Sequence, residues 1–567
     1  MMRIQCRRVG ALVGALLLGA AAHTHAQEPP VPPQLPAEVA VEAIDFHNRP
    51  ETVRFEGELR LASGAEMVGD VAVLGGPVEL GGRLRGNLVL INGDLHLRPG
   101  ARVEGGILVV GGSVTGLENA RVTGAVRVYP EALRYRREGE LLALAVPSAG
   151  AGISTGREFE FGRTDLTLAV RGSYNRVEGL PIALGPQFRL GHSNPTRIDG
   201  FVVYRTAAGL VPELDELGWG VRVEQEIGGH GAWRIGVRAR SEIVPIEDVG
   251  ITDRENSLAV FVLHRDYRDY YEREGGSGYL RWSPPNGRND IWVEYARERH
   301  HRVPVRDPWT LLHNSEAWRL QPVVGEGTLG MLRLGFGYDS RSEPRDPSAG
   351  WLIRIETERA VDGELSVPVI FAPGGDSAIA ATAPAESRYT SAIIDIRRYA
   401  RLGPSARLSL RLLAAGSLDG GPLPPQRQRT LGGEGSIPGF PRFDFDCGAR
   451  RAAASLEDGR YFPAYGCDRA TLLQLEYRAA LPLFSRLARR LDLPPAFADV
   501  PSWVAFIDVG RAWTEADARN GRTGGPDNFE ADAGLGLRLG PLGFYGAVPL
   551  SGAGQGLNFF VRIGSRL

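Results

Sequence analysis

Two segments near the C-terminus alternate between apolar and polar side chains, and this pattern limits the possible folds more than any other feature. Within residues 470–481, one face of an extended chain carries Leu473, Leu475 and Tyr477, and the other carries Gln474, Glu476 and Arg478. Within residues 502–513, one face carries Trp503, Ala505, Ile507 and Val509, and the other carries Phe506, Asp508 and Gly510. A two-residue period marks a β-strand whose faces meet different surroundings. The apolar face therefore packs on a protein core, or it meets lipid while the other face lines a polar lumen.

Similar segments recur along most of the chain. The candidate strands lie near 183–192, 197–206, 217–227, 232–243, 256–266, 277–284, 289–299, 328–338, 350–360, 388–400, 405–417, 470–481, 502–513, 530–539, 542–549 and 557–567. A further segment, DLTLAVRGSYN at 165–175, is also strand-like, and if it is a strand then another candidate is spurious. The sequence predicts an all-β fold with an antiparallel transmembrane β-barrel of about 16 strands over residues 176–567.

Connection lengths give this barrel an orientation. The connections 339–349 and 401–404 are short, whereas 361–387 and 418–469 are long. Bacterial outer-membrane barrels have short periplasmic turns and long external loops. The segment 418–469 is therefore expected to be an external loop.

The N-terminus indicates export. Arg3, Arg7 and Arg8 precede the apolar run GALVGALLLGAAA, and a small-x-small site ends at Ala26, so residues 1–26 are predicted to be a signal peptide. The Pro-rich residues 27–50 are predicted to be an extended linker. The location follows as the bacterial outer membrane, with the N-terminal domain in the periplasm.

Residues 51–130 repeat a unit of two short Val/Leu strands, with equivalent glycines at Gly69, Gly86, Gly105 and Gly124. Repetition at this period predicts a small periplasmic β-solenoid, with the glycines at corners where positive φ is expected. Val71, Val73, Val78 and Leu80 are expected to stack on Leu88, Leu90, Leu95 and Leu97. The unit resembles a bactofilin-type β-helix, either a platform for a periplasmic protein or a passive spacer. Residues 131–175 form a junction to the barrel.

Four motifs carry a second resemblance. They are LGGEGSIPGF at 431–440, LEYR at 475–478, FIDVG at 506–510 and GYDSRSEPRDPSAGW at 337–351. In this order they resemble the BamA/TamA family of outer-membrane barrels, also called the bacterial surface-antigen family. The resemblance implies polypeptide insertion or translocation, or lipid handling, with outer-membrane lipid and lipopolysaccharide as surroundings. That family ordinarily carries POTRA domains before the barrel, but residues 27–150 show no convincing amphipathic helix.

The same resemblance implies a latch in which the 418–469 loop folds into the lumen. Its loop residues would be Gly432, Gly433, Ser436, Ile437, Gly439, Phe440 and Arg442, and its luminal partners Glu476, Arg478, Phe506, Asp508 and Gly510. The family pairs an Arg of the loop motif with the Asp of the strand motif. Pro438 stands at the Arg position here, so we expect Arg442, the nearest substitute, or another luminal Arg to supply the cation.

Two cysteines of the predicted mature chain, Cys447 and Cys467, lie in this loop. In an exported protein they predict one disulfide, with two separate thiols as the alternative.

The sequence offers no sign of catalysis. A net charge of −2 gives no reason to expect nucleic acid. We expect no enzyme activity, no cofactor and no metal. The alternatives to polypeptide or lipid handling are a porin-like solute channel and a structural anchor that presents the solenoid to a periplasmic partner.

Overall fold

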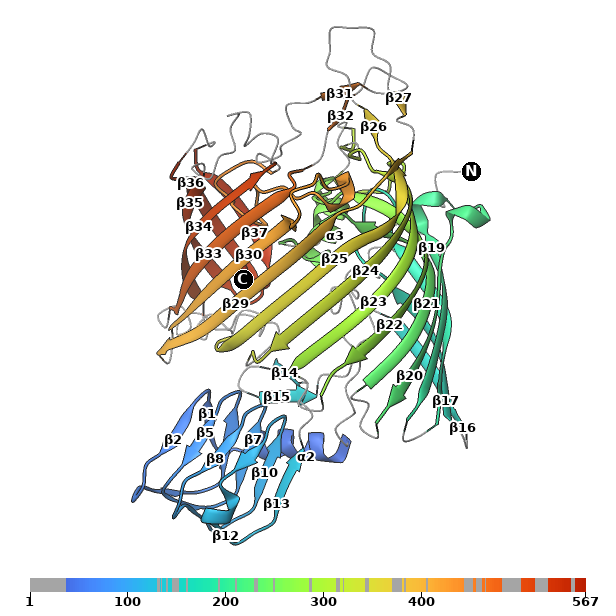
Figure 1. The fold of residues 1–567 in the computed structure, drawn as a ribbon. Coiled ribbons are helices and arrows are strands. Elements are labelled where there is room, and N and C mark those ends of the chain that lie inside the picture. The colour runs from blue at the N-terminus through green and yellow to red at the C-terminus, as the bar shows by residue number, and fades with distance from the viewer. Residues whose placement is uncertain are drawn as a thin grey trace, which may run out of the picture.

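Figure 1 shows two parts, a wide barrel-shaped sheet and a smaller solenoid beside one of its ends. This computed structural model describes residues 37–567 with gaps, the longest at 145–151, 370–379, 443–451, 482–500 and 515–528. The predicted signal peptide lies outside the described residues. Among the described helices, none is long and apolar enough to cross a membrane.

The large part is one antiparallel sheet of 18 strands that follow each other in chain order. Its strands are β16 (Gly152–Phe159), β17 (Gly162–Val170), β18 (Pro181–Leu190), β19 (Thr196–Arg205), β20 (Gly218–Ile227), β21 (Trp233–Pro245), β22 (Tyr270–Trp282), β23 (Asn289–His301), β24 (Glu326–Asp339), β25 (Gly350–Ser366), β28 (Ala385–Glu386), β29 (Thr390–Gly403), β30 (Ala406–Ser417), β33 (Arg469–Ala480), β34 (Ser502–Trp513), β35 (Glu530–Leu539), β36 (Leu542–Pro549) and β37 (Asn558–Ile563). β28 is a two-residue piece. Two small hairpins, β26 (Pro368–Val369) with β27 (Ala380–Ala381) and β31 (Ala452–Ala454) with β32 (Tyr461–Pro463), stand apart from the sheet.

One predicted strand is wrong. Residues 256–266 fall mostly in helix α3 (Asp253–Leu263), which starts with a capping box formed by Thr252 and Glu255. Such a box satisfies two backbone donors and starts a helix. The sheet also begins earlier than predicted, because β16 and β17 lie within the predicted junction 131–175. The other predicted segments all coincide with strands.

The two ends of the sheet differ. Arg288, in the short β22–β23 turn, pairs with Asp94 of the solenoid at 2.8 Å. Arg401 of β29 pairs with Glu56 at 3.0 Å. The short-turn end therefore faces the solenoid (Figure 1), and the long connections lie at the other end.

The solenoid has three parallel sheets. Their strand orders are β1-β4-β7-β10-β13, β2-β5-β8-β11 and β3-β6-β9-β12. The strands are β1 (Val53–Glu56), β2 (Leu59–Leu61), β3 (Glu66–Val68), β4 (Val71–Leu74), β5 (Val78–Leu80), β6 (Arg83–Arg85), β7 (Leu88–Ile91), β8 (Leu95–Leu97), β9 (Arg102–Val103), β10 (Ile107–Val110), β11 (Val114–Thr115), β12 (Arg121–Val122) and β13 (Val126–Tyr129). Val71 and Val73 pair with Leu88 and Leu90, which is the stacking that the repeat predicts.

The repeated glycines are required for a reason other than the expected one. Only Gly69 of the four has a positive φ, at 110°. At Gly86 an added Cβ would lie 2.2 Å from the Gly69 carbonyl oxygen, and at Gly105 it would lie 2.5 Å from that of Gly86. Stacked turns approach too closely for a side chain here, so contact between backbones fixes these glycines.

The predicted linker is shorter than expected, because residues 37–48 form helix α2 (Ala37–Asn48). Its buried face, which includes Ala43 and Ile44, packs on the outer side of the β4-β7-β10 sheet. Asn48 closes this layer by bonding both backbone groups of Leu142, in the hairpin of β14 (Tyr135–Glu138) and β15 (Leu141–Leu144). One sheet of the solenoid is therefore covered on both faces.

Candidate functional site

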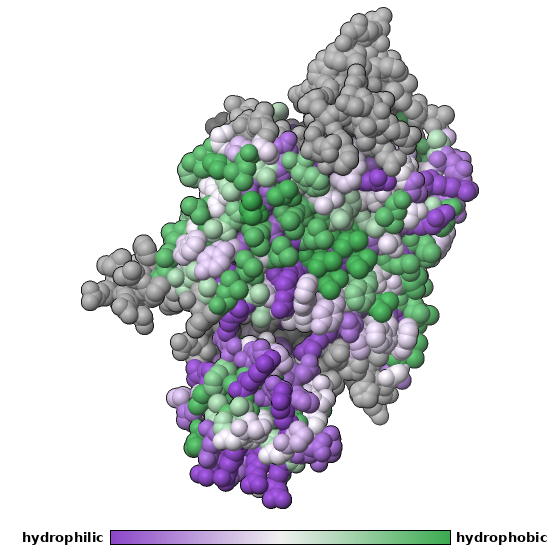
Figure 2. All heavy atoms as spheres, turned by 60° about the vertical axis from the view of Figure 1, so that its left-hand side comes forward, coloured by the Kyte–Doolittle hydropathy of each residue, from purple (hydrophilic) through white to green (hydrophobic). Residues whose placement is uncertain are grey.

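The strands of the large sheet separate apolar from charged side chains. On β33 the outward Leu473 is 43% exposed, whereas Gln474 and Glu476 are buried on the inner face. On β34 Ile507 is 39% exposed and Asp508 is fully buried. Figure 2 shows hydrophobic residues spread over the outside of the barrel and hydrophilic residues over the solenoid. The site is therefore sought on the inner face.

The connection between β30 and β33 folds against this inner face. In its short helix η4 (Pro425–Arg427), Gln426 bonds both backbone groups of Gly325. Arg427 donates to Glu358 of β25 at 2.7 Å and to the Tyr271 hydroxyl at 2.7 Å. These contacts hold the first part of the loop to the wall formed by β22 and β25.

The motif residues hold the next part of the loop to the opposite end of the sheet. The Ser436 carbonyl accepts from Gln474 at 2.9 Å, and its hydroxyl accepts from the Gly432 amide at 2.8 Å. The Gly439 amide donates to Asp532 of β35. The Pro438 carbonyl accepts from Asn558 of β37 at 2.8 Å. The loop thus reaches from β25 to β35 and β37.

Apolar packing and three glycines make this fit possible. Ile437 and Phe440 are buried with Leu431 against Leu413 and Leu472. At Gly510, an added Cβ would lie 2.8 Å from Cδ1 of Ile437. At Gly439 it would lie 2.6 Å from Cβ of Asp532. Gly433, with φ of 77°, adopts a backbone conformation that disfavours a side chain.

The cation beside Asp508 is Arg566, the penultimate residue of the sequence. It donates to both Asp508 oxygens at 2.7 and 2.9 Å. It also lies 3.4 Å from Glu476 and stacks over the Phe506 ring. Arg442 instead donates to the Tyr267 carbonyl. Of the two possibilities left open by the sequence, Arg442 or another luminal Arg, the structure has the second, because the chain turns inward after β37 and brings Arg566 to Asp508.

Arg478 lies farther toward the solenoid than the other predicted luminal residues. It pairs with Asp346 at 3.0 Å and donates to the Ser502 hydroxyl at 2.7 Å. It thus belongs to a separate cluster with Arg407 and Arg538.

A second insert, residues 246–269 with helix α3, meets the loop. Glu255 of α3 accepts from Arg562 of β37 at 2.5 Å. Arg562 also donates to the Glu434 and Gly250 carbonyls at 2.7 and 2.6 Å. Glu247 accepts from the Thr430 amide at 2.7 Å. One arginine of the last strand therefore ties both inserts together.

Sequence reasoning did not identify α3, Arg427, Arg562 or Arg566 as parts of this site. The Thr-x-x-Glu signature at 252–255 is typical of a helix N-terminus and could have indicated α3. The arginines carry no local motif that distinguishes them.

The remaining predicted features are placed as follows. Cys467 is buried, but Cys447 lies outside the described residues, so their disulfide stays a prediction. Within the described part of the chain, no group of three or more His, Cys, Asp or Glu side chains is arranged to hold a metal ion.

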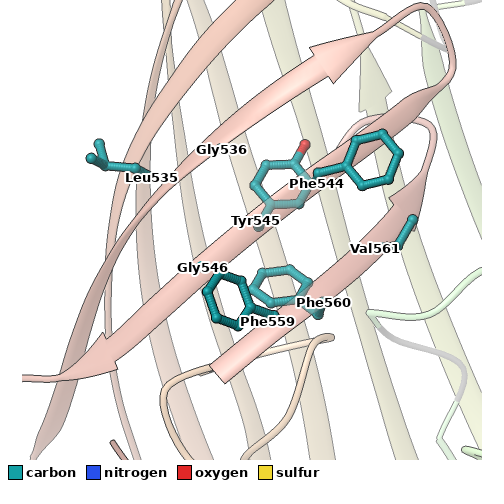
Figure 3. A pocket seen from close by; sticks show the side chains of 8 residues that line it. All are labelled: Leu535, Gly536, Phe544, Tyr545, Gly546, Phe559, Phe560 and Val561. Atoms are coloured by element: carbon teal, nitrogen blue, oxygen red, sulfur yellow. The ribbon is translucent and has the colours of Figure 1, made fainter. Parts of the chain in front are cut away.

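A shallow hollow of about 410 Å³ lies on the last hairpins (Figure 3). Its lining is Leu535, Gly536, Phe544, Tyr545, Gly546, Phe559, Phe560 and Val561. Leu535 and Phe559 are 66% and 75% exposed. Tyr545 and Phe560 are instead buried, so the lining combines outward and inward side chains of these strands. Because this lining is apolar apart from Tyr545, the hollow is no candidate for a polar ligand.

Comparisons with known proteins were made at three levels. No protein-family model and no curated protein matches the sequence. The chain is similar in structure to BamA from Haemophilus ducreyi lacking POTRA domains 1–3, with 17% identity and a TM-score of 0.43 over 72% of this chain and 71% of that one. It is also similar to CdiB from Acinetobacter baumannii, with 11% identity and a TM-score of 0.30 over 72% and 61% of the two chains. CdiB from Escherichia coli is similar with 12% identity and a TM-score of 0.32, over 76% of this chain and 67% of that one. These identities and TM-scores are low, and function is therefore inferred from the contacts described above.

Proposed function

We propose that this chain spans the bacterial outer membrane as a barrel and handles polypeptide there. The sorting of side chains supports the membrane location. Leu473, Ile507 and Leu535 are exposed on the outer face, whereas the carboxylates Glu476, Asp508 and Asp532 of the same strands are buried on the inner face. A basic residue at the lipid-facing midplane of such a barrel costs about 2–4 kcal/mol, which selects this sorting. Outer-membrane lipid and lipopolysaccharide are then its surroundings.

The strongest support for a gated protein is the loop that crosses the lumen. Arg427 binds Glu358 on β25, and Gly439 binds Asp532 on β35. Between these strands the sheet runs through β29, β30, β33 and β34, so the loop extends across the interior. Helix α3 adds a second insert, fixed to β37 by Glu255. A passive pore requires an open water path, so these inserts favour a gated role over a porin-like channel.

The ends of the sheet support polypeptide as the ligand. The sheet runs from β16 to β37, and among the described residues no ladder joins these two strands. An unpaired strand edge offers backbone N–H and C=O groups that an extended polypeptide can pair with, as in β-strand addition. Such pairing selects backbone rather than sequence, which suits a protein that handles many polypeptides. The four sequence motifs imply the same class of function through their family resemblance.

A photo-crosslinker placed in living cells tests this proposal. A crosslinker at Phe559 on β37 is expected to capture outer-membrane polypeptides that have not yet assembled. Mass spectrometry identifies the captured polypeptides. The control is Leu473 on β33, which is also outward and exposed but lies inside the sheet. Capture from Phe559 alone supports the proposal. Equal capture from both positions, or none, contradicts it.

A solute channel is tested separately by conductance. The intact chain in a planar bilayer is expected to conduct much less than a variant lacking residues 428–469. Equal conductance would favour the channel.

A structural anchor remains the third candidate, because the solenoid docks on the barrel through Arg288–Asp94 and Arg401–Glu56. This role predicts that a periplasmic protein binds the full-length chain but not a variant that lacks the solenoid.

A further inference from the structure

Three arginines converge on the inner face near the solenoid-side end of the sheet. They are Arg407 on β30, Arg478 on β33 and Arg538 on β35, with 11%, 16% and 8% of their side chains exposed. Arg407 and Arg478 are direct cross-strand neighbours, and Arg538 is the neighbour of Ser502, which Arg478 also contacts. The three guanidinium groups therefore form one continuous cluster, here called the arginine cradle.

A single carboxylate occupies this cradle. Oδ1 of Asp346 accepts from Arg478 at 3.0 Å and from Arg538 at 2.8 Å, and it also accepts from Arg407. Arg407 donates in addition to the carbonyl oxygen of Pro347 at 3.0 Å. Asp346 belongs to the β24–β25 turn, so this turn reaches past β29 to strands farther along the sheet. The turn is thus an intramolecular ligand of the cradle.

The charges in the cradle are unequal. Among the described residues, three guanidinium groups face one carboxylate, which gives this set a net charge of about +2, and each Arg offers five N–H donors. Nε of Arg407 is buried without a hydrogen-bond partner. On the neighbouring strand β29, Asp395 is shared by Arg397 and Arg411, so this wall has a further excess of positive charge. An excess of buried guanidinium groups is costly unless anions compensate it.

Asp346 stays charged in this setting. Burial acts to raise its pKa, but Arg538, Arg407 and Arg478 together hold the pKa below its usual range. A carboxyl group with a depressed pKa in the folded state stabilises that state above its unfolded pKa and loses this effect only as the pH falls through the folded value. The turn is therefore held throughout the neutral range.

We propose that the arginine cradle is a binding site for a phosphate or carboxylate group, and that Asp346 occupies it in the resting state. Planar guanidinium groups bind both kinds of anion through paired hydrogen bonds. A phosphate has more acceptor oxygens than the one carboxylate oxygen now shared by three arginines, so it matches the unused donors better. An arriving anion displaces Asp346 and releases the β24–β25 turn from the opposite wall. This site does not depend on polypeptide handling.

The experiment measures binding of inorganic phosphate to the folded full-length chain in detergent by isothermal titration calorimetry. Asp346→Asn keeps the shape of the side chain and removes the competing charge. It is expected to bind phosphate on the order of tenfold tighter than the wild type, because the anion no longer competes with an internal carboxylate. The double variant Asp346→Asn with Arg478→Gln is expected to lose this gain.

The matched control is Asp346→Asn with Arg238→Gln. Arg238 also lines the inner face, where it pairs with Glu294 at 2.6 Å on other strands. The double variant with Arg238→Gln should keep the tighter binding of phosphate. If the Arg478 variant does not fold, Arg538→Gln replaces it. A second titration with phosphatidic acid in mixed micelles identifies the source of the phosphate, and a gain with either ligand that needs Arg478 supports the site. An absent gain, or a gain that survives Arg478→Gln and Arg538→Gln, overturns the proposal.

Discussion

Arg566 has an almost completely buried side chain and is an ion-pair partner of both Asp508 and Glu476. It faces Asp508 at 2.7 Å and Glu476 at 3.4 Å, and its guanidinium stacks 3.9 Å from the Phe506 ring centre. Removing one member of such a buried pair costs about 3–5 kcal/mol, because the other charge is left without compensation. The last residues of the chain therefore help to hold the wall on which the loop rests.

Gly510 is the residue at which loop docking is tested most directly. Gly510→Ala places a methyl group 2.8 Å from Ile437, which is closer than carbon atoms approach. Overpacking of this kind costs roughly 1–3 kcal/mol. We expect the loop to be displaced, so that protease cleaves within 418–469 several times faster and conductance in a planar bilayer rises. The strand itself should remain in place.

Gly200→Ala is the control for this variant. Gly200 also lies within a strand, β19, and an added Cβ there meets nothing within 4 Å. Its digestion rate and conductance should match the wild type. Equal effects of both variants would show that glycine in the strands matters for backbone reasons and not for docking Ile437.

The sequence predicted the inner face of this site but not its cation. Asp508, Glu476 and Gly510 fall on one face because a strand repeats every two residues. Arg566 follows the end of β37 at Ile563, where no period applies. Pro438 at the expected Arg position left the charge partner open, and Arg442 was nearer in sequence but lies against Tyr267.

At the scale of elements, local signals competed in residues 246–269. The segment 256–266 is apolar enough for a strand, but the capping box of Thr252 and Glu255 starts a helix. Tertiary contacts then stabilise it, because Glu255 also accepts from Arg562. A short apolar run does not distinguish the two structures by periodicity alone.

The sequences of three solenoid strands indicate that a further layer covers their outer side. VAVL, LVLI and ILVV at β4, β7 and β10 are apolar without interruption, and all their residues are buried. A strand that is apolar on both faces is covered on both faces. Helix α2 and the β14–β15 hairpin pack on this outer side.

Val109 tests whether the solenoid folds as a separate unit. It is fully buried and stacks between Leu90 and Val128. Val109→Asp places an unpaired charge in an apolar stack, which costs several kcal/mol against a typical domain stability of about 5–15 kcal/mol. We expect the solenoid to become protease-sensitive while the barrel keeps its heat-dependent shift in gel mobility.

Val128→Asp is the matched control. Val128 occupies the same column on the terminal turn and is 41% exposed, so its carboxylate reaches water. This variant should leave the solenoid resistant to protease. Loss of the barrel's gel shift in Val109→Asp would instead mean that the two parts fold together.

At the scale of the whole molecule, polar contacts between described residues join the solenoid to the barrel. Asp94 pairs with Arg288, and Glu56 pairs with Arg401. Exposed ion pairs contribute about 0.2–1 kcal/mol each and weaken in salt. No sequence pattern predicted these pairs, because each joins two residues that are far apart in the chain and belong to no common repeat or alternation.

The joint is therefore expected to open without unfolding either part. Asp94→Asn combined with Glu56→Gln removes both charges, and the Asn oxygen can still accept from Ser113, the present partner of Asp94. Small-angle X-ray scattering of the detergent-solubilised chain should show a larger radius of gyration, with unchanged circular dichroism. The wild type should show the same change in about 0.5 M salt, where the Debye length is only a few ångströms.

The pH dependence gives the joint a second signature. Partial burial acts to raise the pKa of Asp94, but Arg288 and Ser113 outweigh it and lower the pKa below its usual value. A depressed carboxyl pKa means that the pair stabilises the docked state at neutral pH and is lost as the pH falls through the folded value. At low salt the wild type should therefore be compact at neutral pH and extend in acid, whereas the double variant should be extended at every pH. Glu79→Gln is the control, because Glu79 pairs within the solenoid with Arg98. If the double variant stays compact, the solenoid is held by contacts other than these two ion pairs.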